Sequence, residues 1–145
     1  MHGLEVVDIA RAIQLALAPV FLLSGIGVFL GVLTSRLARV VDRARVIERE
    51  LRQEPAAEPD GARAQLRAMA RRARYINHAI TFATVGGFST ALVVALLFVS
   101  TFVPLNLAAY VAVLFVFAMI SLLAAFLSFL VEIRIAIAAL RIGGQ

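Results

Sequence analysis

The sequence predicts an all-α membrane protein with three transmembrane helices, of which the first two extend into a cytoplasmic antiparallel helical hairpin. The 145 residues are 62% hydrophobic and only 16% charged, whereas a soluble domain has roughly 45–50% apolar and about 25% charged residues. Uncharged residues fill two long stretches, 12–35 and 75–131, and eleven of the fourteen arginines lie between them. The chain contains no cysteine, which excludes disulfide bonds, zinc–cysteine sites and thiol nucleophiles.

The first predicted transmembrane helix covers residues 12–35 and follows an outer N-terminal segment, residues 1–11. Its 24 uncharged residues suffice to cross a hydrocarbon core, which needs about 20. A cleavable signal peptide is disfavoured, because its apolar region would be only roughly 7–15 residues long and its N-terminal side basic. Here that side carries Glu5 and Asp8 against Arg11, so we expect a retained helix.

The charged segment 36–75 predicts a helical hairpin with a turn at residues 54–61. Apolar residues recur in alternating steps of four and three, which is the heptad spacing of paired helices. They are Leu33, Leu37, Val40, Ala44, Ile47 and Leu51 on the first arm, and Ala62, Leu66, Met69, Ala73, Ile76 and Ile80 on the second. Pro55 and Pro59 stop the first arm, and Asp60 is a suitable N-cap for the second. Both patterns continue into the flanking spans, so each arm and its span should form one continuous helix.

The second uncharged stretch is too long for a single crossing and must fold back. Pro104 supplies the break, because proline lacks an N–H donor and disfavours helix at the preceding residue. We therefore predict transmembrane helices at 76–103 and 107–131, an outer turn at 104–106 and a tail at 132–145. The spans should be helical, because backbone groups in lipid must bond within their own segment.

The distribution of arginines predicts the orientation of the chain. Segment 36–75 holds eleven arginines, the N-terminal segment holds one, the turn at 104–106 holds none and the tail holds two. Basic residues collect on the cytoplasmic side of membrane proteins. We expect the N-terminus outside, and the hairpin and the C-terminus in the cytoplasm.

Two arginine stripes on the hairpin are candidate sites for lipid or a partner. They are Arg36, Arg39 and Arg43 next to the membrane, and Arg63, Arg67, Arg71 and Arg74 on the second arm. One interpretation is a solvated face with side chains that snorkel at the membrane surface. A second is binding of anionic lipid, and a third is a site for nucleic acid or an acidic protein. Six acidic residues mixed among the arginines weaken the third, so no nucleic acid is expected.

Small residues recur along all three spans and are candidates for helix packing or a pore lining. They include Gly27, Gly31 and Ser35 in the first span, Gly87 in the second, and Ser121 and Ser128 in the third. Such rows allow helix backbones to approach closely in lipid. Packing within the three-helix unit is the first interpretation, and a subunit interface or a pore lining is the second. Because small rows on all three helices exceed what the internal contacts need, we expect a homo-oligomer.

A few polar residues complete the list of candidates within the spans. They are Gln14, Asn77, Thr81, Thr84 and Glu132, together with Pro19. Asn77, Thr81 and Thr84 share a face and could line a wet crevice, although hydroxyl bonds to their own helix explain the threonines as well. Glu132 should pair with Arg36 or Arg74, and a ring of Glu132 side chains at the mouth of an oligomeric pore is the alternative.

The chain carries no sequence pattern typical of an enzyme. It lacks the H-E-x-x-H, G-x-S-x-G and P-loop motifs, and no pair of acids lies inside the membrane. Its two histidines, His2 and His78, are expected on opposite sides of the membrane. We therefore expect no catalytic residue, no cofactor and no metal.

Three stretches resemble a known family. They are AIQLALAPVFLLSGIG at 12–27, LTSRLARVVDRAR at 33–45 and RRARYINHAI at 71–80. Together they resemble a family of small bacterial integral membrane proteins classed as a domain of unknown function. The resemblance implies a multi-pass protein of the bacterial inner membrane, and it implies no activity and no site residue.

The sequence supports two hypotheses about function. The first is a homo-oligomeric membrane protein that forms or regulates a pore, with the arginine-rich hairpins as its vestibule. The second is a structural or adaptor protein whose hairpin binds a cytoplasmic protein or anionic lipid.

Overall fold

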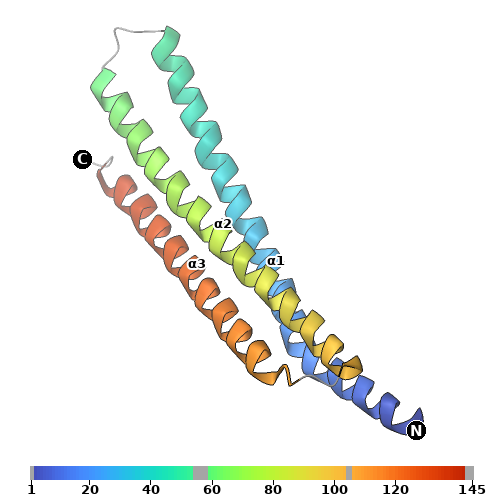
Figure 1. Ribbon diagram of the computed structural model, residues 1–145. Coiled ribbons are helices and arrows are strands. Elements are labelled where there is room, and N and C mark those ends of the chain that lie inside the picture. Colours follow the sequence, from blue (N-terminus) through green and yellow to red (C-terminus); the bar gives the residue numbers. More distant parts are fainter. Residues whose placement is uncertain (1, 54–58, 104–105, 143–145) are drawn as a thin grey trace. The chain divides into compact units, whose positions relative to one another are not determined.

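The computed structural model describes residues 2–53, 59–103 and 106–142, and these residues form three helices (Figure 1). They are α1 (His2–Gln53), α2 (Pro59–Phe102) and α3 (Ala108–Ile142). Each is long and apolar enough to cross a membrane. The structure therefore confirms an all-helical chain with three helices of membrane-spanning character.

The helices are longer than the predicted spans. α1 is unbroken over 52 residues and α2 over 44, so the predicted continuity of each arm with its span is confirmed. Pro19 lies inside α1. α3 runs on to Ile142, so the part of the predicted tail that is described is helical.

The predicted turn at 54–61 is too long at its C-terminal side. α2 already begins at Pro59, because proline has no N–H to lose in the first helical turn and its φ angle suits a helix. Asp60 therefore lies in the first turn, where a negative charge favours the helix dipole, and is not an N-cap before the helix. The rest of this turn, 54–58, and residues 104–105 of the outer turn lie outside the described residues.

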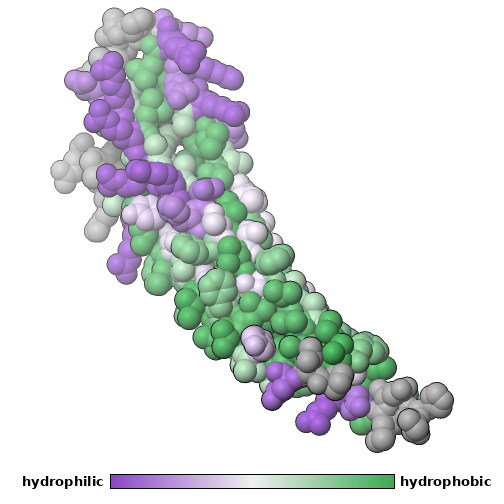
Figure 2. Space-filling model, in the orientation of Figure 1, coloured by the Kyte–Doolittle hydropathy of each residue, from purple (hydrophilic) through white to green (hydrophobic). Residues whose placement is uncertain are grey.

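The chain divides into two compact units, of which the first comprises Met1–Leu30 and Phe82–Leu123. Its buried residues are small or β-branched for the most part, and they are Ala12, Ala16, Pro19, Ile26, Ala83, Gly86, Ser89, Thr90, Val93, Ala118, Ser121 and Leu122. Large apolar side chains such as Phe21 and Phe88 are exposed, and apolar residues dominate its surface in Figure 2. Apolar side chains on the outside are expected where the solvent is lipid.

Two adjacent glycines set the helix contacts of this first unit. A Cβ atom at Gly86 would lie 3.1 Å from Leu122 Cγ and 3.2 Å from the Ala118 carbonyl oxygen of α3. A Cβ at Gly87 would lie 3.3 Å from Ile26 Cγ2 of α1. α2 thus approaches both neighbours through residues that have no side chain.

The second unit comprises Gly31–Thr81 and Ala124–Gln145. Its α1 and α2 segments lie side by side and run in opposite directions (Figure 1). Leu33, Val40 and Ile47 of the predicted first seam are buried, and so is Ile76 of the second, while the other seam residues are half-buried. Hydrophilic side chains gather over these two segments in Figure 2.

Candidate functional site

The second unit contains a fully buried carboxylate, that of Glu132 on α3, held by one arginine from each of the other two helices. The Glu132 side chain has no solvent exposure. Its Oε2 accepts a hydrogen bond of 2.8 Å from Arg36 Nη2 of α1. Its Oε1 accepts two bonds from Arg72 of α2, 3.0 Å from Nη2 and 3.1 Å from Nε. A buried charge is tolerated only when it is paired and hydrogen-bonded, so this cluster ties the three helices together.

Helical spacing explains why these three residues meet. Arg72 precedes the buried Ile76 by four residues, and Arg36 follows the buried Leu33 by three. Glu132 follows the buried Ala125 by seven. Residues three, four or seven apart share one face of a helix, so each charged group extends a face that is already buried.

Arg36 is held on more than one side. Its guanidinium lies 5.2 Å from the centre of the Phe129 ring, a distance at which a cation is attracted to an aromatic face. Its side chain is 29% exposed, although its Nε is buried and has no hydrogen-bond partner among the described residues. The Arg36 guanidinium therefore has both a fixed position and donor capacity that Glu132 does not use.

The predicted pairing of Glu132 is confirmed for Arg36 and wrong for Arg74. Arg74 is exposed, because it lies two residues, or about 200° around the helix, from Arg72. Sequence reasoning missed Arg72 as a site residue. The signal that could have found it is the step of four to Ile76, a residue of the predicted seam.

Four arginines line a cavity of about 380 Å³ beside this cluster, together with Val40. They are Arg36, Arg39, Arg43 and Arg72; we call this the arginine pocket. Arg36 and Arg72 are half-buried by their contact with Glu132, and Arg39 and Arg43 are exposed. In the part of the chain that the structure describes, Arg39 and Arg43 make no ion pair. Of the four arginines that line the pocket, two thus share the carboxylate of Glu132 and two have no carboxylate partner among the described residues.

The other predicted arginines do not join this pocket. Arg63 and Arg67 are exposed, and Arg63 lies 3.9 Å from the carboxylate of Asp60 in a solvent-exposed pair. Arg71 and Arg74 line a separate hollow on α2 together with Tyr75 and His78. The seven predicted arginines therefore separate into three that form a pocket and four that lie outside it.

The predicted small residues also separate into two groups. Gly27, Gly31 and Ser35 are exposed, and a Cβ at either glycine would have no described atom within 4 Å apart from the nearby backbone of its own helix. Packing within the chain therefore does not explain this row. Ser121 is buried and Ser128 half-buried on α3, so these two serve packing inside their units.

The remaining predicted residues lie at separate places. Gln14, Asn77, Thr81 and Thr84 are exposed, and Thr81 Oγ1 donates to the Asn77 carbonyl oxygen at 3.0 Å. This bond is the helix back-bonding considered from the sequence. Pro19 is buried and lines a cavity of the first unit. Within the described residues, no group of three or more His, Cys, Asp or Glu side chains could hold a metal ion.

Comparison with models of protein families shows which family the chain belongs to. The model described as "Protein of unknown function (DUF2721)" matches residues 16–142. The chain belongs to the DUF2721 family. This confirms the resemblance found in the sequence, and the match includes the Glu132 cluster and the whole arginine pocket of this DUF2721 member. Comparisons with curated proteins and with solved structures found no match.

Proposed function

We propose that the chain is a non-enzymatic protein of the bacterial inner membrane that binds anionic phospholipid headgroups in its arginine pocket. The observation that carries this proposal is the imbalance of charge at the pocket: four arginines line it, and only Arg36 and Arg72 are paired with a carboxylate, that of Glu132, among the described residues. The function is then structural, because lipid binding would fix the base of the hairpin at the membrane surface. It corresponds to the second hypothesis from the sequence.

The place of the pocket along the chain supports this proposal. Arg36 directly follows the uncharged stretch 12–35, so it belongs at the level of the lipid phosphates if that stretch spans the bilayer. On the topology proposed from the positive-inside rule, this is the cytoplasmic surface. Anionic lipids of that leaflet attract basic residues near the membrane.

The chemistry of arginine supports it further. The guanidinium group is planar and presents five N–H donors in a fork that matches phosphate oxygens. Glu132 takes one donor of Arg36 and two of Arg72, and so leaves others for a second anion.

Loss of the two exposed pocket arginines tests the proposal. In the double variant Arg39→Ala/Arg43→Ala, binding of phosphatidylglycerol should weaken roughly 30-fold, because each juxtamembrane arginine contributes about 1 kcal/mol. The measurement is native mass spectrometry of the full chain released from detergent, titrated with phosphatidylglycerol or phosphatidylcholine.

The matched control is Arg63→Ala/Arg67→Ala, which removes the same charge from residues outside the pocket. It should change phosphatidylglycerol binding by no more than about threefold, as expected for exposed and screened charges. Equal losses in the two double variants would mean that the whole arm attracts anions and that the pocket is not a site.

A homo-oligomer that forms or regulates a pore is a second candidate, supported by the open face at Gly27 and Gly31. Small residues free on the surface of a membrane helix suit close contact with a second copy. If they form the contact, Gly27→Leu/Gly31→Leu should convert the oligomer to monomer in cross-linking and abolish ion flux in proteoliposomes. A wild-type protein that is monomeric and passes no ions would contradict this candidate.

A further inference from the structure

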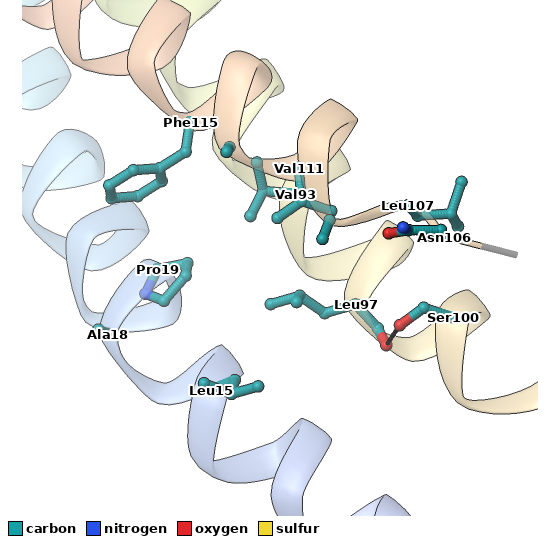
Figure 3. Close-up of a pocket in the computed structure, with 12 residues that line it drawn as sticks. Leu15, Ala18, Pro19, Val93, Leu97, Ser100, Asn106, Leu107, Val111 and Phe115 are labelled. Carbon is teal, nitrogen blue, oxygen red and sulfur yellow. Dashed lines mark hydrogen bonds between the residues drawn. The ribbon is translucent and has the colours of Figure 1, made fainter.

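The first unit contains a cavity of about 580 Å³ that no step of the proposed function uses (Figure 3). All three helices contribute to it, with Leu15 and Pro19 from α1, Val93 and Leu97 from α2, and Val111 and Phe115 from α3. Its volume falls within the roughly 300–1,000 Å³ of small-molecule sites in proteins.

We propose that this cavity binds a hydrocarbon chain of a membrane lipid. Its described lining contains no charged side chain. The hydroxyl of Ser100, one of its few polar groups, donates to the Leu97 carbonyl oxygen at 2.8 Å and is thus already satisfied. An apolar lining without a free polar group in its interior selects an apolar ligand.

The cavity is a local feature and does not reflect loose packing of the whole unit. In the same unit Gly86 brings α2 so close to α3 that a Cβ would meet Leu122 at 3.1 Å. Small side chains of Ala18, Ala108 and Ala112 line the cavity and leave it wide. Side chains that face a gap lose dispersion contacts, and an acyl chain restores them.

The surroundings identify the occupant. All three helices that line the cavity are of membrane-spanning length and composition, so lipid chains are the apolar molecules present around them. Asn106 lies at the edge of the lining, beside Leu107 and ahead of the first turn of α3 (Figure 3). Its side-chain amide can donate to an ester carbonyl oxygen at the head of the same lipid.

A photoreactive lipid tests this proposal on the full chain in nanodiscs. The probe is phosphatidylcholine with a diazirine in one acyl chain, whose zwitterionic headgroup makes the result independent of the arginine pocket. We expect cross-links on the cavity residues of 106–115. Ala112→Phe fills the cavity and should lower this labelling about tenfold, which equals a loss of about 1.4 kcal/mol in binding.

The matched control is Ala109→Phe, the same change at an exposed alanine outside the lining, which should leave the labelling unchanged. Ala18→Phe, which fills the cavity from α1, gives the second test if Ala112→Phe does not fold. Equal labelling of the filled and control variants, or labelling confined to exposed residues such as Tyr110 and Val113, would overturn the proposal. Arg39→Ala/Arg43→Ala should not change the labelling, so this proposal and that of the arginine pocket can fail separately.

Discussion

Glu132→Ala should destabilise the protein by about 3–5 kcal/mol, the largest effect that we expect from any single substitution. The change removes the carboxylate that pairs with Arg36 and Arg72 at 2.8 and 3.0 Å. Breaking a buried ion pair by removing one partner leaves the other charge without compensation. Circular dichroism of the purified protein in detergent, during thermal or denaturant unfolding, measures the loss.

Two further variants show whether the loss of stability in Glu132→Ala comes from breaking the buried ion pairs or simply from removing a glutamate side chain. Glu48→Ala removes the same kind of side chain from an exposed position of α1 and should cost less than about 0.5 kcal/mol. Glu132→Gln keeps the volume and two hydrogen-bonding atoms, so its effect should lie between those of the other two. Similar stability of Glu132→Ala and Glu48→Ala would contradict the structural role of the cluster.

The same variant bears on lipid binding. Without Glu132, the two arginines that it held have no other carboxylate partner among the described residues. A ligand that binds only the folded state stabilises it, and an anionic headgroup would supply the missing negative charge. Phosphatidylglycerol should therefore raise the unfolding temperature of Glu132→Ala by more than that of the wild type, and phosphatidylcholine should not.

Gly86→Leu should destabilise the protein by about 1–3 kcal/mol, the cost of overpacking a close helix contact. Even the first carbon of the new side chain would lie 3.2 Å from the Ala118 carbonyl oxygen, a backbone atom that cannot move alone. The measurement is again helix unfolding in detergent.

Gly25→Leu provides the control for this substitution. It is made in a membrane helix at an exposed glycine, where a Cβ would have no atom within 4 Å. Leucine is the better helix former by about 1 kcal/mol, so Gly25→Leu should be neutral or slightly stabilising. If Gly25→Leu destabilises the protein as much as Gly86→Leu does, the loss in Gly86→Leu does not come from the close contact between α2 and α3.

The sequence predicted the helices well because their signals are strong and local. Long uncharged stretches, Pro104 and the heptad spacing are enough to predict three helices and the continuity of the first two. Glu132 was also predicted to pair with Arg36 or Arg74, since all three lie next to the cytoplasmic ends of the predicted spans, and the structure gives Arg36 as a partner.

Arg72 was not predicted, because the buried face of α2 does not coincide with the predicted seam. The seam includes Ala73 and Ile80, whereas the buried residue is Ala79, one position before Ile80. Arg72 lies seven residues before Ala79 and four before Ile76, and residues at these spacings share one face of a helix. Arg72 therefore extends the buried face from a position next to the seam.

The exposure of the glycines and the apolar cavity could not be predicted from the sequence, for a different reason. A row such as Gly27 and Gly31 suits packing within a chain and between chains equally, so the pattern alone cannot choose. The cavity arises from the distances between three helices, which the sequence does not record locally. Pro19 was only one of the candidates within the spans, although it lies in the cavity wall.

An experimental structure of the full chain in nanodiscs of phosphatidylglycerol would show directly whether lipid binds in the arginine pocket. We expect a lipid phosphate within hydrogen-bond distance of Arg39 or Arg43, while Glu132 still accepts bonds from Arg36 and Arg72. Phosphates spread evenly along both arms of the hairpin, with none in the arginine pocket, would contradict it.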